Sequence, residues 1–151
     1  MKQLKFLMIA IIAISMSACE ENVPADEEII VKDGTYKGTL IVDQNDGTSH
    51  TQENVSVIFE SEENGATIKM LQVSFSPKMP VKLDMTIPKV VTASITEGLS
   101  LSGDNIIPLA MGGEFPQYTI TEMTGQATPQ TISFEMMCGT YPLTFSGTIV
   151  E

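Results

Sequence analysis

The sequence has no tryptophan and no arginine, one histidine (His50) and two cysteines (Cys19 and Cys138). Its eight basic residues are all lysines, they stand against nineteen acids, and the formal net charge is −11. Such an acidic surface repels phosphate groups, so the composition argues against nucleic acid as a partner. It also repels anionic lipid headgroups, so a basic patch is not what would bring this chain to a membrane.

The motifs that mark several enzyme classes are also missing. The sequence has no phosphate-binding Gly-Lys-Ser/Thr loop, no His-Glu-x-x-His pair and no Gly-x-Ser-x-Gly turn. His50 lies in the polar stretch Gly47-Thr-Ser-His50-Thr-Gln, which is typical of a solvated loop. Asp43 begins a stretch similar to a calcium loop, but Thr48 and Asn54 stand where that loop needs glycine and glutamate. We therefore predict that the protein is not an enzyme and has no metal or cofactor.

The first nineteen residues, MKQLKFLMIAIIAISMSAC, have the layout of an export signal. Lys2 and Lys5 precede an apolar run, which ends in small residues followed by Cys19. A cysteine at this place is similar to the lipidation site of bacterial lipoproteins. The resemblance implies cleavage of the signal peptide 1–18, a thioether-linked diacylglycerol on Cys19 and an acylated amine, which together anchor a protein stably in a membrane. The alternative is an ordinary secretory signal with an incidental cysteine.

An acidic segment follows the signal and precedes the domain. Residues 19–32 carry several acids and no sustained period, which predicts a tether. Glu20-Glu21 resembles the acidic export signals of surface lipoproteins in Bacteroidetes. We therefore expect the outer membrane, on its cell-surface or its periplasmic side. Residues 33–151 are long enough for one domain.

From Gly34 onward the chain consists of short alternating runs rich in Thr, Val, Ile and Phe, separated by Gly, Pro, Asn and Asp. This pattern predicts strands and turns. Strands are expected at 34–42, 54–59, 66–75, 81–87, 90–96, 99–101, 106–111, 118–121, 131–138 and 142–150. Pro80 and Pro88 would bracket the fourth strand, and a bulge is expected near Met70. The list predicts an all-β antiparallel barrel of about eight strands closed by pairing of the first and last; the alternative is a two-sheet β-sandwich.

Three segments resemble the calycin-like, lipocalin-resembling lipoproteins of Bacteroidetes. They are Asp33-Gly-Thr-Tyr-Lys-Gly-Thr-Leu, Asn54-Val-Ser-Val-Ile-Phe and Val73-Ser-Phe-Ser-Pro-Lys-Met-Pro-Val. The resemblance implies an antiparallel barrel of about eight strands and a family whose ligands are mostly unassigned. It does not extend to residues 99–125, and the Gly-x-Trp motif of lipocalins is absent.

Two hypotheses for function follow from the expected barrel. Seven of the ten methionines lie beyond Cys19, and methionine adapts to irregular apolar shapes, which suits a pocket for a small apolar or amphipathic ligand. The walls of such a pocket would be Val81, Leu83, Met85, Phe134 and Met136. Alternatively the methionines fill a solid barrel, and the protein is a structural, interaction or inhibitor protein that acts through its loops, with residues 106–118 as the contact loop. Alternation places Cys138 on the apolar side of its strand, as a buried thiol.

Overall fold

The structure, a computed structural model, describes residues 29–150. The predicted signal peptide 1–18, the predicted lipidation site Cys19 and the predicted tether up to residue 28 lie outside the described residues. Within residues 29–150, no helix has the length and apolar character needed to cross a membrane.

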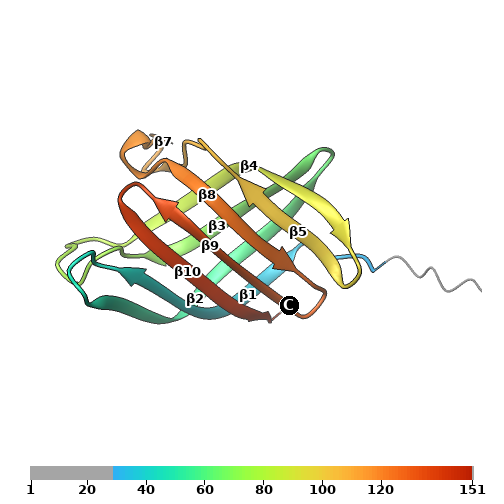
Figure 1. Ribbon diagram of the computed structural model, residues 1–151, viewed down its shortest axis with the longest axis horizontal. Helices are drawn as coiled ribbons and strands as arrows, with labels where there is room; N and C mark the ends of the chain where they lie inside the picture. Colours follow the sequence, from blue (N-terminus) through green and yellow to red (C-terminus); the bar gives the residue numbers. More distant parts are fainter. Residues whose placement is uncertain (1–28, 151) are drawn as a thin grey trace, which may run out of the picture.

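The described chain folds almost entirely into strands, with one turn of 3₁₀ helix (Figure 1). The strands are β1 (Gly34–Asp43), β2 (Ser49–Glu62), β3 (Gly65–Val73), β4 (Leu83–Ile95), β5 (Gly98–Gly103), β6 (Leu109–Ala110), β7 (Gly113–Glu114), β8 (Ile120–Ala127), β9 (Thr131–Cys138) and β10 (Tyr141–Ile149). The 3₁₀ helix η1 (Pro116–Tyr118) precedes β8.

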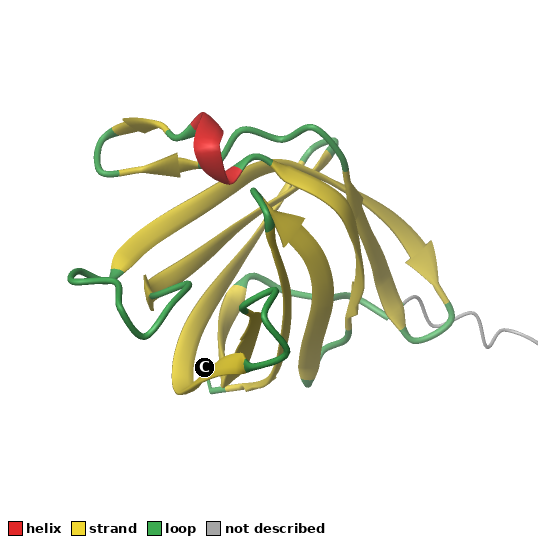
Figure 2. Ribbon diagram, turned by 60° about the vertical axis from the view of Figure 1, so that its left-hand side comes forward, coloured by secondary structure: helices red, strands yellow, loops and turns green. Residues whose placement is uncertain are grey.

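Eight of the strands form a closed antiparallel barrel. Its order is β1-β2-β3-β4-β5-β8-β9-β10, and β10 pairs with β1 to complete the ring. The hairpin of β6 and β7 lies outside this ring, attached to β4 through the pairs Met85↔Ala110 and Thr86↔Leu109 (Figure 2). The predicted all-β barrel of about eight strands, and its closure by the first and last strands, are therefore confirmed.

The inward faces of the barrel strands fill its interior with one hydrophobic cluster. Strand β9 shows the pattern, because Ile132, Phe134, Met136 and Cys138 are buried and alternate with more exposed residues. The rings of Phe134 and Phe145 pack with centroids 5.4 Å apart. Burying one side chain of this size contributes about 1.5–3 kcal/mol, so the cluster is the main source of stability.

Strand β4 differs from the prediction, which ended one strand at Pro88 and began another at residue 90. The structure has a single strand that continues through Pro88. Lys89 has a φ of 57°, and the register with β3 shifts at this point. Such a bulge takes residues out of the hydrogen-bonded ladder, so a proline without an N–H group can stand inside the strand. A second register shift, between Met70 and Val73, confirms the predicted bulge.

The two ends of the barrel differ in their connections. At one end, here called the loop end, are the connections 44–48, 74–82, 104–119 and 139–140. At the other, the hairpin end, are the short turns 63–64, 96–97 and 128–130 and the start of β1. Residues 29–33, which precede β1, therefore join the barrel at the hairpin end, and the longer loops lie at the opposite end (Figure 1).

Candidate functional site

The five predicted wall residues do not all share one environment. Leu83, Met85, Phe134 and Met136 are buried in the hydrophobic cluster, on two strands of the barrel. Val81 instead precedes β4, in the 74–82 connection, and its side chain is 60% exposed. The alternation that placed Val81 on the inner face was wrong, because the strand begins two residues later, at Leu83.

The buried residues fill the interior rather than surround a hollow. Leu40, Phe59, Met70 and Met85, which lie on four strands, have essentially no surface that a water-sized sphere can reach. Such a side chain touches other protein atoms on all sides, so it does not border a space large enough for a ligand. An eight-stranded barrel is wide enough either for its own side chains or for one small ligand, and here side chains occupy the interior.

The loop end is closed by the connection 74–82. Phe75 is buried, and its ring packs against Tyr118 and Tyr141 with centroids 4.7 and 6.3 Å away. The Gln44 side-chain amide donates a hydrogen bond to the Phe75 carbonyl at 2.8 Å, which holds this connection to the 44–48 loop. The backbone N–H of Ser74 donates to Gln52 Oε1 at 3.1 Å. These contacts cover the mouth that a ligand would have to enter.

His50 belongs to the same closure and not to a solvated loop. It lies in β2, is half-buried, and its Nε2 is 2.9 Å from Ser74 Oγ. The sequence suggested a loop because β2 begins with a run of polar residues, near the rim of the barrel, and has no apolar alternation there. The histidine therefore helps to hold the closing connection.

The hairpin end is closed as well. Val31, from the segment before β1, is part of the hydrophobic cluster. Tyr36 is fully buried, and its hydroxyl donates a hydrogen bond of 3.1 Å to the carbonyl of Thr128 in the turn between β8 and β9. Burial raises the pKa of Tyr36 above its usual value. Val31, which falls within the predicted tether 19–32, is thus part of the domain's core.

Cys138 is buried, as predicted. Its S–H donates to the Tyr118 carbonyl at 3.6 Å, and burial raises the pKa of the thiol to about 12. Because the thiolate is the reactive form, this cysteine is protected from nucleophilic chemistry at neutral pH. Among residues 29–150, no group of three or more His, Cys, Asp or Glu side chains is placed to hold a metal ion.

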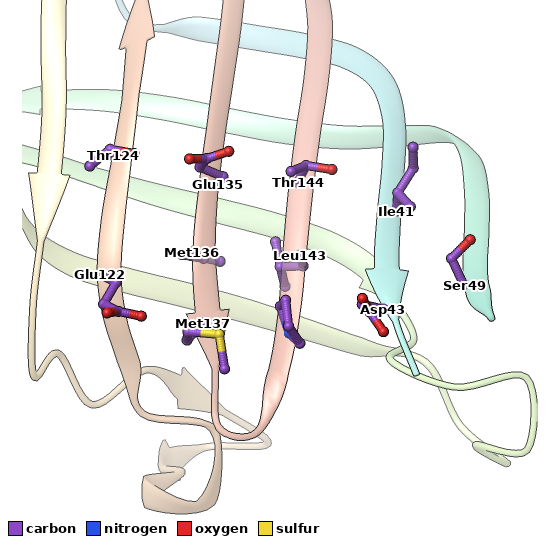
Figure 3. A pocket seen from close by; sticks show the side chains of 11 residues that line it. Ile41, Asp43, Ser49, Glu122, Thr124, Glu135, Met136, Met137, Leu143 and Thr144 are labelled. Atoms are coloured by element: carbon purple, nitrogen blue, oxygen red, sulfur yellow. The ribbon is translucent and has the colours of Figure 1, made fainter. Parts of the chain in front are cut away.

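A large hollow lies on the outside of the barrel. It is a groove of about 590 Å³ over β8, β9, β10, β1 and the start of β2, here called the outer groove (Figure 3). Two adjacent cross-strand rows of outward-facing side chains form it. One row is Thr124, Glu135, Thr144 and Ile41, which are paired in register. The other is Glu122, Met137, Pro142, Asp43 and Ser49.

The sequence analysis did not identify the outer groove. Alternation along β9 indicates that Glu135 and Met137 face outward, but it says nothing about which residues of other strands lie beside them. That information is in the register of β8, β10 and β1, which the sequence does not specify by itself. A bulge at Glu122, where φ is 52°, also shifts this register.

The predicted contact loop, residues 106–118, is only partly exposed. Ile106 and Ala110 are buried, whereas Met111 is 76% exposed at the turn between β6 and β7. Leu109 is also exposed, and the rings of Phe115 and Tyr118 stack with centroids 5.3 Å apart. Leu109 and Met111 therefore present apolar side chains to solvent from this hairpin, which lies beside η1 outside the barrel (Figure 2).

Comparisons of this chain with protein-family models, with curated proteins and with solved structures find no match.

Proposed function

We propose that this chain is a lipid-anchored protein of the bacterial cell envelope whose filled barrel is a rigid support for protein–protein contacts. The lipid on Cys19 would hold it at the outer membrane, and its loops and outer surface would bind a partner. The observation that carries the proposal is the filled interior, in which large residues from four strands have no reachable surface. We include in this proposal that the chain is related to the calycin-like lipoproteins that its sequence resembles.

The position of the anchor supports the same function. The tether joins the barrel at the hairpin end, so a membrane anchor there leaves the opposite end free. At that free end lie the exposed Met111 and Leu109 of the β6–β7 hairpin. Large exposed apolar side chains that lie together are typical of surfaces that contact other proteins.

The hypothesis of an internal apolar ligand needs a change in the structure. A ligand could enter only if Phe75 left its place against Tyr118 and Tyr141, with loss of the Gln44 hydrogen bond. It would then have to displace packed side chains. The two hypotheses therefore predict different masses for the isolated protein.

Native mass spectrometry of the full chain, extracted from membranes in a non-ionic detergent, tests both the anchor and the filled barrel. We expect the mass of a chain that begins at Cys19 and carries acyl groups, with no other bound molecule. A Cys19→Ala variant should lose the acyl mass. An uncleaved or unacylated wild-type chain would overturn the anchor, and a stoichiometric apolar adduct would overturn the filled barrel.

Site-specific photo-cross-linking in cells tests the contact with a partner. A photoreactive residue at Met111, on the exposed hairpin, should give a discrete cross-linked protein. The matched control is Ser94, which is exposed on β4 near the hairpin end. Cross-linking that is equal at both positions, or absent at Met111 and at Thr144 of the outer groove, would contradict the proposal.

A further inference from the structure

The outer groove has a charge pattern that selects its occupant. Glu122 and Glu135 lie on the β8–β9 side and Asp43 lies on the β1 side (Figure 3). The apolar side chains of Met137 and Pro142, which are paired in register on β9 and β10, lie between Glu122 and Asp43. Acidic groups thus border both ends of an apolar floor. One Asp43 oxygen accepts a hydrogen bond from the backbone N–H of Asn45 at 2.7 Å.

The strands around the groove supply almost no positive charge. No lysine, arginine or histidine follows Lys89 in the sequence, so β5 to β10 have no basic side chain. The ion pair found among residues 29–150, Lys69 with Glu60 at 3.0 Å, joins β3 to β2 instead. Lys37 of β1 is paired with Thr148, toward the hairpin end. The groove acids therefore face solvent without a cation from β8, β9 or β10.

The acids are too far apart for one small cation. No group of three acidic, histidine or cysteine side chains within residues 29–150 is placed to hold a metal ion. Neighbouring strands are about 4.8 Å apart, so the three steps from β8 to β1 span about 14 Å. In an extended peptide, residues four apart are separated by about 13–14 Å and point to the same side. The residue midway between them points the same way.

We propose that the outer groove binds an extended basic segment of a partner protein with the pattern basic–x–apolar–x–basic. This inference rests on the proposed function and names the class of partner. The two basic side chains would pair with Glu122 and Glu135 on one side and with Asp43 on the other. The apolar side chain between them would cover Met137 and Pro142, which line the middle of the groove. Hydroxyl groups of Thr124 and Thr144 would accept the remaining ammonium hydrogens.

The test is titration of the full chain, in a non-ionic detergent, with the fluorescent peptide Gly-Lys-Ser-Leu-Ser-Lys-Gly. We expect binding that weakens with salt, because the charges involved are exposed. In the double variant Glu122→Gln/Glu135→Gln the Kd should rise about tenfold. The matched control is Glu63→Gln/Glu97→Gln, which removes the same charge from two turns at the hairpin end. Its Kd should change less than about twofold, since these acids lie far from the groove.

Several outcomes would overturn the inference. Equal weakening by both double variants would mean that net charge, not the groove, attracts the peptide. The peptide Gly-Ser-Leu-Lys-Lys-Ser-Gly has the same composition but adjacent lysines, which point to opposite sides of an extended chain. If it bound as tightly as the first peptide, the proposed spacing of the basic residues would be wrong. Equal binding of spermine would assign the groove to a free polyamine. If the peptide fails while cross-links at Met111 persist, the inference fails and the proposed function stands.

Discussion

The inner and outer faces of the same three strands, β8, β9 and β10, follow different rules. On β9 the inward side chains of Phe134 and Met136 are almost completely buried, whereas Glu135 between them is exposed. The inward residues meet neighbours from the whole barrel, so their size and shape are fixed. The outward residues meet only the adjacent strands and solvent. Changes on the inner face should therefore alter stability, and changes on the outer face should alter binding.

The strongest way to test this difference is Phe134→Ala. The substitution removes a ring that packs against Phe145 and leaves a cavity in the interior. We expect the free energy of unfolding to fall by about 3–5 kcal/mol. Ser133→Ala, on the outer face of the same strand, should change it by less than about 0.5 kcal/mol. Urea denaturation of both variants measures the difference, and a similar loss in the two would remove the distinction between the faces.

A second prediction concerns the point where β1 closes the ring on β10. A Cβ atom at Gly38 would collide with the Ser146 carbonyl and with Gly147. Gly38→Ala should therefore force the strands apart and cost about 1–3 kcal/mol. At Gly113, in β7, an added Cβ meets nothing within 4 Å. Gly113→Ala should be close to neutral. Thermal unfolding measures both variants, and equal melting temperatures of Gly38→Ala and Gly113→Ala would contradict this prediction.

The inner face is also the part of the molecule that the sequence predicts best. The pattern of apolar residues correctly predicted that Leu83, Met85, Phe134 and Cys138 face the interior, because each apolar side chain carries its own tendency to leave water. The closed barrel followed from the number of strands and the regular turns. The prediction failed at Val81 because the sequence analysis took Pro80 as the residue before the strand, whereas the 74–82 connection continues to residue 82 and β4 begins at Leu83.

The outer groove could not be predicted in the same way. Alternation along β9 predicts that the side chain of Glu135 faces outward. Its neighbours Thr124 and Thr144, however, are eleven and nine residues away in the sequence, and only the strand register brings them beside it. A one-residue slip in any of these strands would turn the row to the other face. Outward residues do not resist such a slip, since the register is determined by the buried residues of the same strands.

A third prediction concerns Tyr36, which is fully buried at the hairpin end of the barrel. Tyr36→Phe removes the hydroxyl that donates to the Thr128 carbonyl, and we expect a loss of about 1 kcal/mol at pH 7. Because burial raises the pKa of Tyr36, the unfolded chain releases this proton first as the pH rises above 10. The free energy of unfolding of the wild type should therefore decrease as the pH rises from 10 through the folded pKa of Tyr36. Over this range the difference in stability between the wild type and Tyr36→Phe should narrow. The matched control is Tyr141→Phe, on a partly buried ring, which should cost less than Tyr36→Phe at pH 7.

The smallest effect is expected on the outer surface, at Asp84 of β4. Its Oδ1 accepts hydrogen bonds from the backbone N–H of Gln72 at 2.8 Å and from the Gln72 side chain at 3.0 Å. These bonds lower the pKa of Asp84 below 3.8, so the carboxylate stabilises the fold above that pH. The benefit is lost as the pH falls through the folded pKa.

Asp84→Asn should therefore cost less than about 1 kcal/mol at pH 7, because solvent screens an exposed carboxylate. The difference from wild type should narrow as the pH falls through the folded pKa of Asp84, which lies below 3.8. Glu97→Gln, in the exposed turn between β4 and β5, controls for the change in net charge. Chemical denaturation across pH 2–7 measures both variants. A loss as large as that of Phe134→Ala would mean that the bulge at Gln72, held by this outer-face carboxylate, is as important to the barrel as the packing inside it.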